Sequence, residues 1–204
     1  MEYHSSSASN WARRGKKEVA MASLFSLHPQ QQVCLWINVV GGLAVILSYV
    51  LPILTHQGDS QVLWGGISGG LRNFYFVSML LAALSYFAFT YFILFRLNPE
   101  TVQVFQVMNF VVFPIIYCLI LIPSALWMPL TYAMVGQPQV GLWIGIRAVL
   151  FIVGLAALCL VIALLALSPC PGGAAYWLAV AGSIIFCLRT LVLDGMVWPA
   201  FFKT

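Results

Sequence analysis

Three charged residues lie inside long apolar stretches of the sequence, where charge is least expected. They are Arg147, Arg189 and Asp194. A charge near the centre of a lipid bilayer costs roughly 2.5 to 3.5 kcal/mol on insertion scales, so each one needs a partner or a task. Two interpretations follow. Either the charges only hold helices together, or at least one of them contacts a polar group of a bound ligand.

The spacing of these charges decides which of them can meet. Arg147 lies about 9 Å along a helix from the start of its apolar stretch, and Asp194 lies near the end of the next stretch. Because consecutive helices joined by a short loop run antiparallel, an ion pair between Arg147 and Asp194 is geometrically allowed. Arg189 precedes Asp194 by five positions, a turn of roughly 140° on an α-helix. We therefore expect Arg189 to face Asn109, Tyr117 or backbone carbonyls freed by prolines of the third stretch.

The sequence contains seven tryptophans, and four of them are candidates for one site. Trp127, Trp143 and Trp198 lie at ends of apolar stretches that an antiparallel bundle places on the same side, and Trp64 lies in a long loop on that side. Aromatic walls with a few polar anchors are the usual form of a small-molecule site. An aromatic belt at the membrane interface explains the same residues equally directly.

The sequence contains no constellation that is typical of catalysis. His4, His28 and His56 lie outside the apolar stretches, and the five cysteines show no metal-binding spacing. There is no G-x-S-x-G elbow, no phosphate-binding glycine loop and no pair of intramembrane carboxylates. We therefore expect no enzyme, no metal site and no cofactor.

The elements that must position these residues follow from composition. Of the 204 residues, 62% are hydrophobic and only 7% are charged, whereas soluble domains have about 25% charged residues. The basic residues form no stripe on a polar surface, so nucleic acid is excluded as a partner. The composition predicts an all-α, polytopic bundle of transmembrane helices in a lipid bilayer.

Hydropathy divides the chain into a polar, basic head, residues 1–32, and a transmembrane domain, residues 33–204. The head is expected to be poorly ordered, and it is either a plain tail or an organellar transit segment. The five apolar stretches each suffice to cross a hydrocarbon core of about 30 Å. Their predicted bounds are 33–54, 74–95, 102–127, 141–167 and 176–202.

Three further features could shape a site or an interface. The loop at residues 55–73 is long enough to be a binding lid, although a flexible connector is the alternative. Pro114 and Pro123 lie within the third stretch and Pro129 just past its end, which indicates either a kinked helix beside a cavity or simple curvature. A G-x-x-x-G spacing begins at Gly141 and permits close helix contact, including contact in a homodimer.

The distribution of basic residues indicates an orientation, because cytoplasmic loops of membrane proteins carry an excess of Lys and Arg. An odd number of helices, here five, places the two termini on opposite sides of the membrane. The side of the head carries five basic residues and the other side two, namely Arg13, Arg14, Lys16, Lys17 and Arg96 against Arg72 and Lys203. We expect a cytoplasmic N-terminus, and if the head is cleaved or imported the count decides nothing.

Two short motifs resemble the tryptophan-rich sensory protein/translocator protein family. Trp127-Met128-Pro129-Leu130-Thr131-Tyr132 is similar to the W-x-P-aliphatic-x-aromatic ending of that family's third helix. Leu193-Asp194-Gly195-Met196-Val197-Trp198 is similar to its L-N-x-x-V-W signature, with Asp in place of Asn. The resemblance covers about the last 80 residues. The first loop lacks the family's W-P-W segment, and Arg147 stands where the family has an acid or amide.

The resemblance implies five helices around a pocket for a tetrapyrrole, a sterol or a similar flat apolar ligand, with sensing or transport rather than turnover as the role. It implies that Trp127, Pro129, Trp143, Asp194 and Trp198 line the pocket. The alternative is a structural or assembly subunit of a membrane complex, whose internal charges and glycines serve partner helices.

Overall fold

The computed structural model describes residues 27–55, 64, 67 and 69–202. Its helices are α2 (Pro29–Thr55), α3 (Gly69–Phe95), α4 (Val112–Gly136), α5 (Val140–Leu165) and a last, continuous helix that consists of α6 (Gly173–Cys187), η2 (Leu188–Val197) and α7 (Trp198–Phe201). Within these residues five helices are long and apolar enough to cross a membrane. The predicted all-α integral membrane bundle is therefore confirmed.

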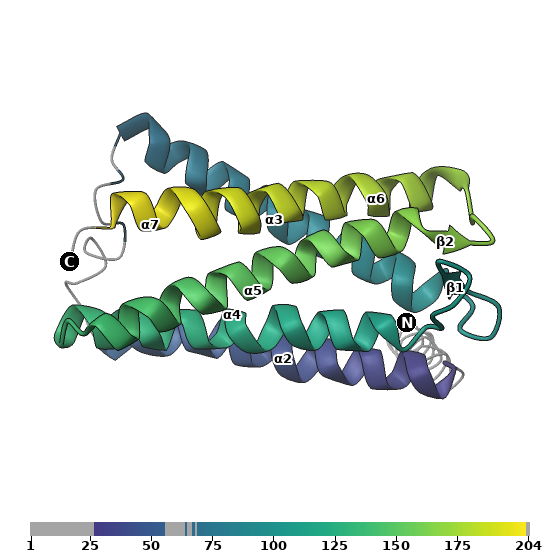
Figure 1. Cartoon of the computed structure of the whole chain (residues 1–204), viewed down its shortest axis with the longest axis horizontal. Coiled ribbons are helices and arrows are strands. Elements are labelled where there is room, and N and C mark those ends of the chain that lie inside the picture. The colour runs from purple at the N-terminus through teal and green to yellow at the C-terminus, as the bar shows by residue number, and fades with distance from the viewer. Residues whose placement is uncertain (1–26, 56–63, 65–66, 68, 203–204) are drawn as a thin grey trace, which may run out of the picture.

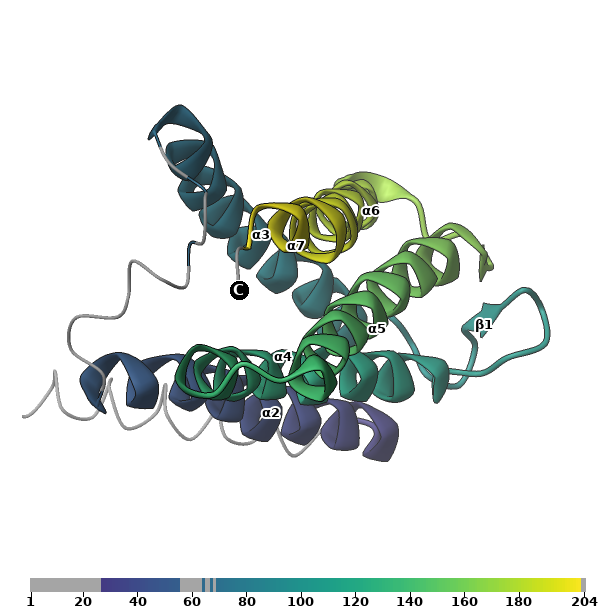
Figure 2. The same cartoon turned by 60° about the vertical axis from the view of Figure 1, so that its left-hand side comes forward.

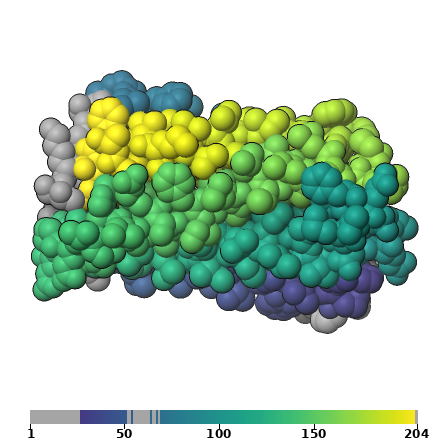
Figure 3. Space-filling view, viewed as in Figure 1, coloured from purple at the N-terminus to yellow at the C-terminus, as the bar shows by residue number. Residues whose placement is uncertain are grey.

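The five helices follow one another around the bundle in an order that differs from the sequence. α4 packs against α2 and α5, α5 packs against the last helix, and α3 packs against α6. α5 lies between α4 and the last helix in the ribbon and space-filling views (Figures 1 and 3). α2 and α3 touch only slightly, and the view in Figure 2 shows α2 with α4 on one side of α5 and α3 with α7 on the other.

The bundle has two ends of different character. At the head end α2 begins, and strand β1 (Gln103–Val104) pairs antiparallel with strand β2 (Leu167–Ser168). At the tail end α7 ends, close to the end of α4 and the start of α5 (Figure 1). Antiparallel packing of consecutive helices thus gathers the termini of α2, α3, α4, α5 and α7 at the tail end, as the topology predicted.

The main hydrophobic core lies toward the head end and joins α3, α4, α5 and α6. Phe89 and Tyr117 are fully buried in it. The Tyr117 hydroxyl donates a hydrogen bond to Thr90 Oγ1 at 2.8 Å. Each buried polar group with an internal partner avoids the cost of desolvation in a membrane, where no water can replace that partner.

The predicted boundary between head and bundle, at residue 33, was wrong by four residues. α2 begins at Pro29, a residue suited to the first helical position because its missing N–H has no partner there in any case. The Gln31 side chain is buried, and its Nε2 donates to the carbonyls of Leu94 and Leu97, both at 2.9 Å. The polar glutamines therefore belong to the helix, because the end of α3 satisfies one of them. The head up to residue 26 lies outside the described residues.

The third helix begins ten residues later than predicted, at residue 112 and not at residue 102. Residues 102–111 are mostly apolar, but they form β1 and a turn in which Phe105 and Gln106 have φ values of 55° and 59°. Val104 is buried by its pairing with β2, and hydropathy cannot distinguish that burial from a membrane span. α4 runs instead from Val112 to Gly136, so Pro129 lies inside the helix and not past its end.

Two glycines allow close helix packing, and neither belongs to the predicted G-x-x-x-G spacing. A Cβ added at Gly154 would lie 2.7 Å from the Cα of Leu191, so α5 and η2 approach one another at this point. A Cβ at Gly182 would lie 3.2 Å from the Ser85 carbonyl of α3. At Gly141, by contrast, an added Cβ meets nothing within 4 Å. The predicted spacing serves no close contact within the described chain.

Candidate functional site

Four tryptophans from four segments converge at the tail end, as the topology predicted. The rings of Trp127 and Trp198 meet edge to face with centroids 5.7 Å apart, and Trp143 lies 6.4 Å from Trp198. Phe202 packs against Trp198 at 4.6 Å and stacks on Trp143 at 5.7 Å. Trp64 belongs to the same hydrophobic group. We call these five residues the tryptophan cluster.

Trp64 is the described part of the long first loop, and α3 fixes its ring. The indole lies 5.0 Å from the ring of Phe76 and 6.5 Å, edge to face, from Tyr75. The guanidinium of Arg72 lies 5.0 Å from the indole centroid, a cation–π distance. Of the predicted lid at residues 55–73, residues 56–63, 65–66 and 68 lie outside the described residues, and residues 69–73 belong to α3 and not to a loop.

The buried charges pair within one helix and not between helices. Arg189 Nη1 donates to Asp194 Oδ1 in an ion pair, and the Arg189 side chain is only 9% exposed. The residues between them form η2, a π-helix whose hydrogen bonds join residues five apart. The predicted separation of roughly 140° holds for an α-helix and not for this geometry. Such π segments are rare and are frequent at functional sites.

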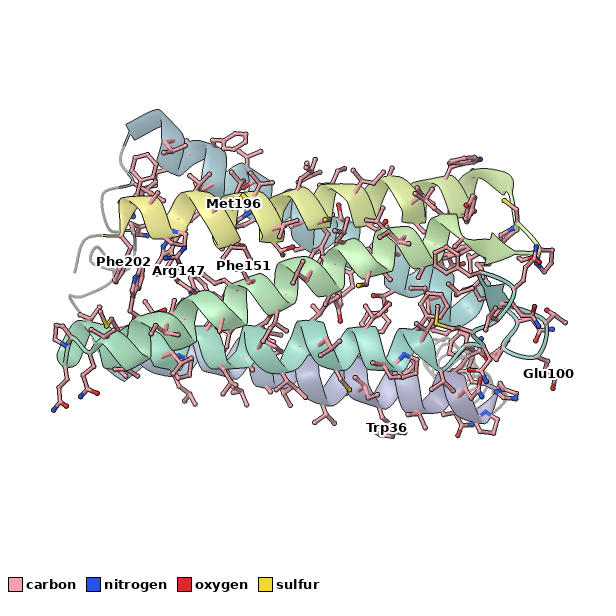
Figure 4. All side chains as sticks on the ribbon, in the orientation of Figure 1. Trp36, Glu100, Arg147, Phe151, Met196 and Phe202 are labelled. Atoms are coloured by element: carbon pink, nitrogen blue, oxygen red, sulfur yellow. The ribbon has the colours of Figure 1, made fainter. Side chains whose placement is uncertain are left out.

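Both sequence-based expectations for the arginines were therefore wrong. Arg147 does not pair with Asp194, because Arg189 already occupies that carboxylate, and Arg147 lies exposed on α5 (Figure 4). Arg189 does not reach Asn109 or Tyr117. Asn109 lies at the head end, where its Oδ1 accepts from the Val111 N–H at 3.2 Å, and the Tyr117 hydroxyl is engaged with Thr90.

Two tyrosines that sequence reasoning missed complete the surroundings of the pair. The Tyr75 ring lies 4.9 Å below the Arg189 guanidinium, and its hydroxyl donates to the Leu193 carbonyl at 2.9 Å. Tyr49 packs on Trp127 at 5.7 Å, and the electric fields of Asp194 and Arg189 reach its hydroxyl. Both lie near the tail-end termini of the first two spans. Their position, at the same predicted depth in the bundle as Asp194, was the signal that could have identified these tyrosines as site residues.

Two buried N–H groups at this end make no hydrogen bond to the described residues. They are Trp127 Nε1 and Arg189 Nε. A buried donor without an acceptor costs about 1 to 3 kcal/mol, and more when it is charged. The Tyr75 ring that packs on Arg189 belongs to the same hydrophobic group as Trp127, so the two donors border one aromatic region. This region is therefore rich in donors that lack acceptors.

The predicted pocket residues thus divide into two groups. Trp64, Trp127, Trp143, Trp198, Arg189 and Asp194 lie together at the tail end. Arg147 and Pro129 are exposed on α5 and α4. Pro129 lies inside α4, where it removes one backbone N–H donor from the helix.

One surface pocket of about 730 Å³ lies at the other end of the bundle. It is lined by Phe105 and Gln106 of the turn after β1, by Ile162 and Leu165 of α5, and by Cys170. Its place at the head end separates it from the tryptophan cluster. Among the described residues, no group of three or more His, Cys, Asp or Glu side chains could hold a metal ion.

No protein-family model matches the chain, and no curated protein or solved structure matches it either.

Proposed function

We propose that this integral membrane protein binds a flat, apolar small molecule, such as a tetrapyrrole or a sterol, at the tail end of the bundle, and that it acts in sensing or transport. The ligand lies against the tryptophan cluster, beside the Arg189–Asp194 pair. The observation that carries the proposal is the presence there of two buried donors, Trp127 Nε1 and Arg189 Nε, without acceptors. Apolar walls with a few unsatisfied polar groups are the usual composition of such a site.

The family resemblance supports the same location. Its two motifs are far apart in sequence, one ending α4 and the other ending the last helix. The edge-to-face contact between Trp127 and Trp198 joins them directly in space. Asp194, which replaces the family's Asn, receives its counter-charge from Arg189. Both motifs therefore border one site.

The direct test is quenching of tryptophan fluorescence by a porphyrin, with the half-saturation concentration as the readout. We expect saturable quenching by wild type in detergent. Trp127→Phe and Trp198→Phe should each raise the half-saturation concentration about fivefold, because the smaller ring, and at Trp127 the lost N–H donor, removes about 1 kcal/mol of contact. The matched controls are Trp36→Phe and Trp177→Phe, since these rings are 65% and 60% exposed and lie outside the cluster.

Two outcomes would overturn the proposal. One is quenching that rises linearly with porphyrin and never saturates. The other is an equal effect of all four substitutions, which would indicate partition into the micelle. Blue-native electrophoresis of the solubilised native membrane tests the alternative role as an assembly subunit. An obligate subunit migrates with a larger complex and is unstable alone.

We also propose that the tail end faces away from the cytoplasm. Arg96 follows α3 at the head end, and in the sequence a basic run at residues 13–17 precedes α2, which begins at that end. The excess of basic residues on that side supports a cytoplasmic head end by the positive-inside rule. The ligand site is then nearest to the opposite face of the membrane.

A further inference from the structure

Arg189 has more hydrogen-bond donors than partners. A guanidinium carries five N–H donors in a planar fork. The side chain is nine-tenths buried, and its single hydrogen bond runs from Nη1 to Asp194. The Tyr75 ring covers one face of the guanidinium at 4.9 Å, so that face cannot take an acceptor. The Nε edge is buried and without a partner, and it is the part of Arg189 that a ligand can use.

The charge beside that edge is already balanced. Arg189 and Asp194 form a neutral pair, and α2 and α4 contribute no charged residue to their surroundings. On the other packed helices the described charges are Arg147, which is exposed, and Arg72, which lies over Trp64. An anion bound at Nε would be separated from the Asp194 carboxylate only by the guanidinium group itself. Like charges so close in a low dielectric repel strongly.

We infer that the ligand presents a neutral oxygen acceptor, a carbonyl, ester or hydroxyl, to Arg189 Nε, and that Asp194 excludes a carboxylate from that position. The inference rests on the proposed function, and it narrows the ligand to neutral flat apolar molecules that carry oxygen. Trp127 Nε1 is a second buried donor on the same aromatic region. Asp194 thereby determines specificity through charge, without touching the ligand.

The test uses two probes that share one chromophore, protoporphyrin IX and its dimethyl ester. Near pH 8 the carboxylic acids of the first are ionised, and the second has none. Quenching is measured for both in the same detergent. We expect wild type to bind the ester at least about tenfold more tightly than the acid, and Asp194→Asn to shift that ratio about tenfold toward the acid. Arg96→Gln, at the head end, should leave the ratio unchanged.

Each outcome is decisive. A wild-type preference for the ester that Asp194→Asn reduces and Arg96→Gln leaves unchanged supports the inference. Saturable quenching with equal affinities, or with a preference for the acid, overturns the inference and leaves the proposed function standing. An ester preference that Asp194→Asn and Arg96→Gln leave alike reflects micelle partition and overturns it too. Absence of saturable quenching by either probe overturns both. Should Asp194→Asn fail to fold, the double variant Arg189→Met with Asp194→Leu replaces it. Loss of the ester preference in that variant supports the inference, and an unchanged preference overturns it.

Discussion

The two ends of the bundle differ in which buried polar groups lack partners. At the head end Tyr117 bonds to Thr90 and Gln31 to the carbonyls of Leu94 and Leu97, and the unsatisfied buried atom described there is an acceptor, Gln30 Oε1. At the tail end Arg189 and Trp127 keep buried N–H groups without acceptors. Unsatisfied donors lower stability, and they persist where a function requires them. Among the described residues, the buried donors without acceptors thus lie at the end where we propose the ligand site.

The backbone geometry of the last helix also differs between the two ends of the bundle. α6 is a regular α-helix that packs on α3, whereas η2 widens into ten residues of π-helix. The wider turn places Asp194 over Arg189, so the ion pair depends on this irregular segment. Gly154 allows α5 to support η2 at close range. The tail end therefore combines a rare backbone geometry with a buried charge pair.

The largest expected effect is on the ion pair itself. Asp194→Ala leaves Arg189 buried and charged without a partner, and we expect the free energy of unfolding in detergent to fall by about 3 to 5 kcal/mol. Combining Arg189→Met with Asp194→Leu removes both charges and should recover most of that loss. Denaturant unfolding followed by near-ultraviolet circular dichroism measures both. A double variant as unstable as Asp194→Ala would show that packing, not charge, dominates at this end.

Loss of the close contact between α5 and η2 should have a smaller effect on the free energy of unfolding. Gly154→Ala places a Cβ 2.7 Å from the Cα of Leu191, so α5 and η2 must separate. We expect a loss of about 1 to 3 kcal/mol in the free energy of unfolding and weaker porphyrin binding. The control is Gly145→Ala, whose Cβ meets only Leu130 Cδ1 at 4.0 Å and should change stability by less than about 0.5 kcal/mol. Unaltered binding in Gly154→Ala would separate η2 from the ligand site.

A pair of hydroxyl deletions compares the two ends directly. Tyr117→Phe removes the hydrogen bond to Thr90, and Tyr75→Phe removes the one to the Leu193 carbonyl. Each should cost about 0.5 to 1.5 kcal/mol of unfolding free energy. Only Tyr75→Phe should also weaken porphyrin binding, because the hydroxyl bond to the Leu193 carbonyl fixes the ring that packs on Arg189. Equal effects on binding would remove the functional distinction between the ends.

The fold was predictable because hydropathy over a span of about 20 residues is a strong signal. The gathering of Trp127, Trp143 and Trp198 followed from antiparallel topology alone. The start of α4 was not predictable, because Val102 and Val104 are buried in and beside a short strand, and their apolar character resembles that of a membrane helix. Hydropathy reports burial, and it does not report whether lipid or protein provides it.

The site was less predictable than the fold, for a geometric reason. The choice of partner for Asp194 depended on assuming 3.6 residues per turn. No composition signal in the segment Leu188–Val197 distinguishes a π-helix from an α-helix, so Arg189 was rejected and Arg147 was favoured. Tyr49 and Tyr75 were missed because a tyrosine in an apolar span resembles packing. Only the nearby charged residues, Arg189 and Asp194, distinguish these two tyrosines from ordinary packing residues.

The last prediction concerns which end faces the cytoplasm, and it should alter neither stability nor binding. Cys170 is exposed in the loop between α5 and α6 at the head end, whereas the other cysteines lie within the spans. A membrane-impermeant maleimide should therefore label Cys170 in inside-out vesicles and not in right-side-out vesicles. Gln137→Cys in a Cys170→Ser background, exposed between α4 and α5, should show the reverse. The opposite labelling of both sites would contradict the positive-inside assignment. In that case ligand would reach the tryptophan cluster from the cytoplasmic face.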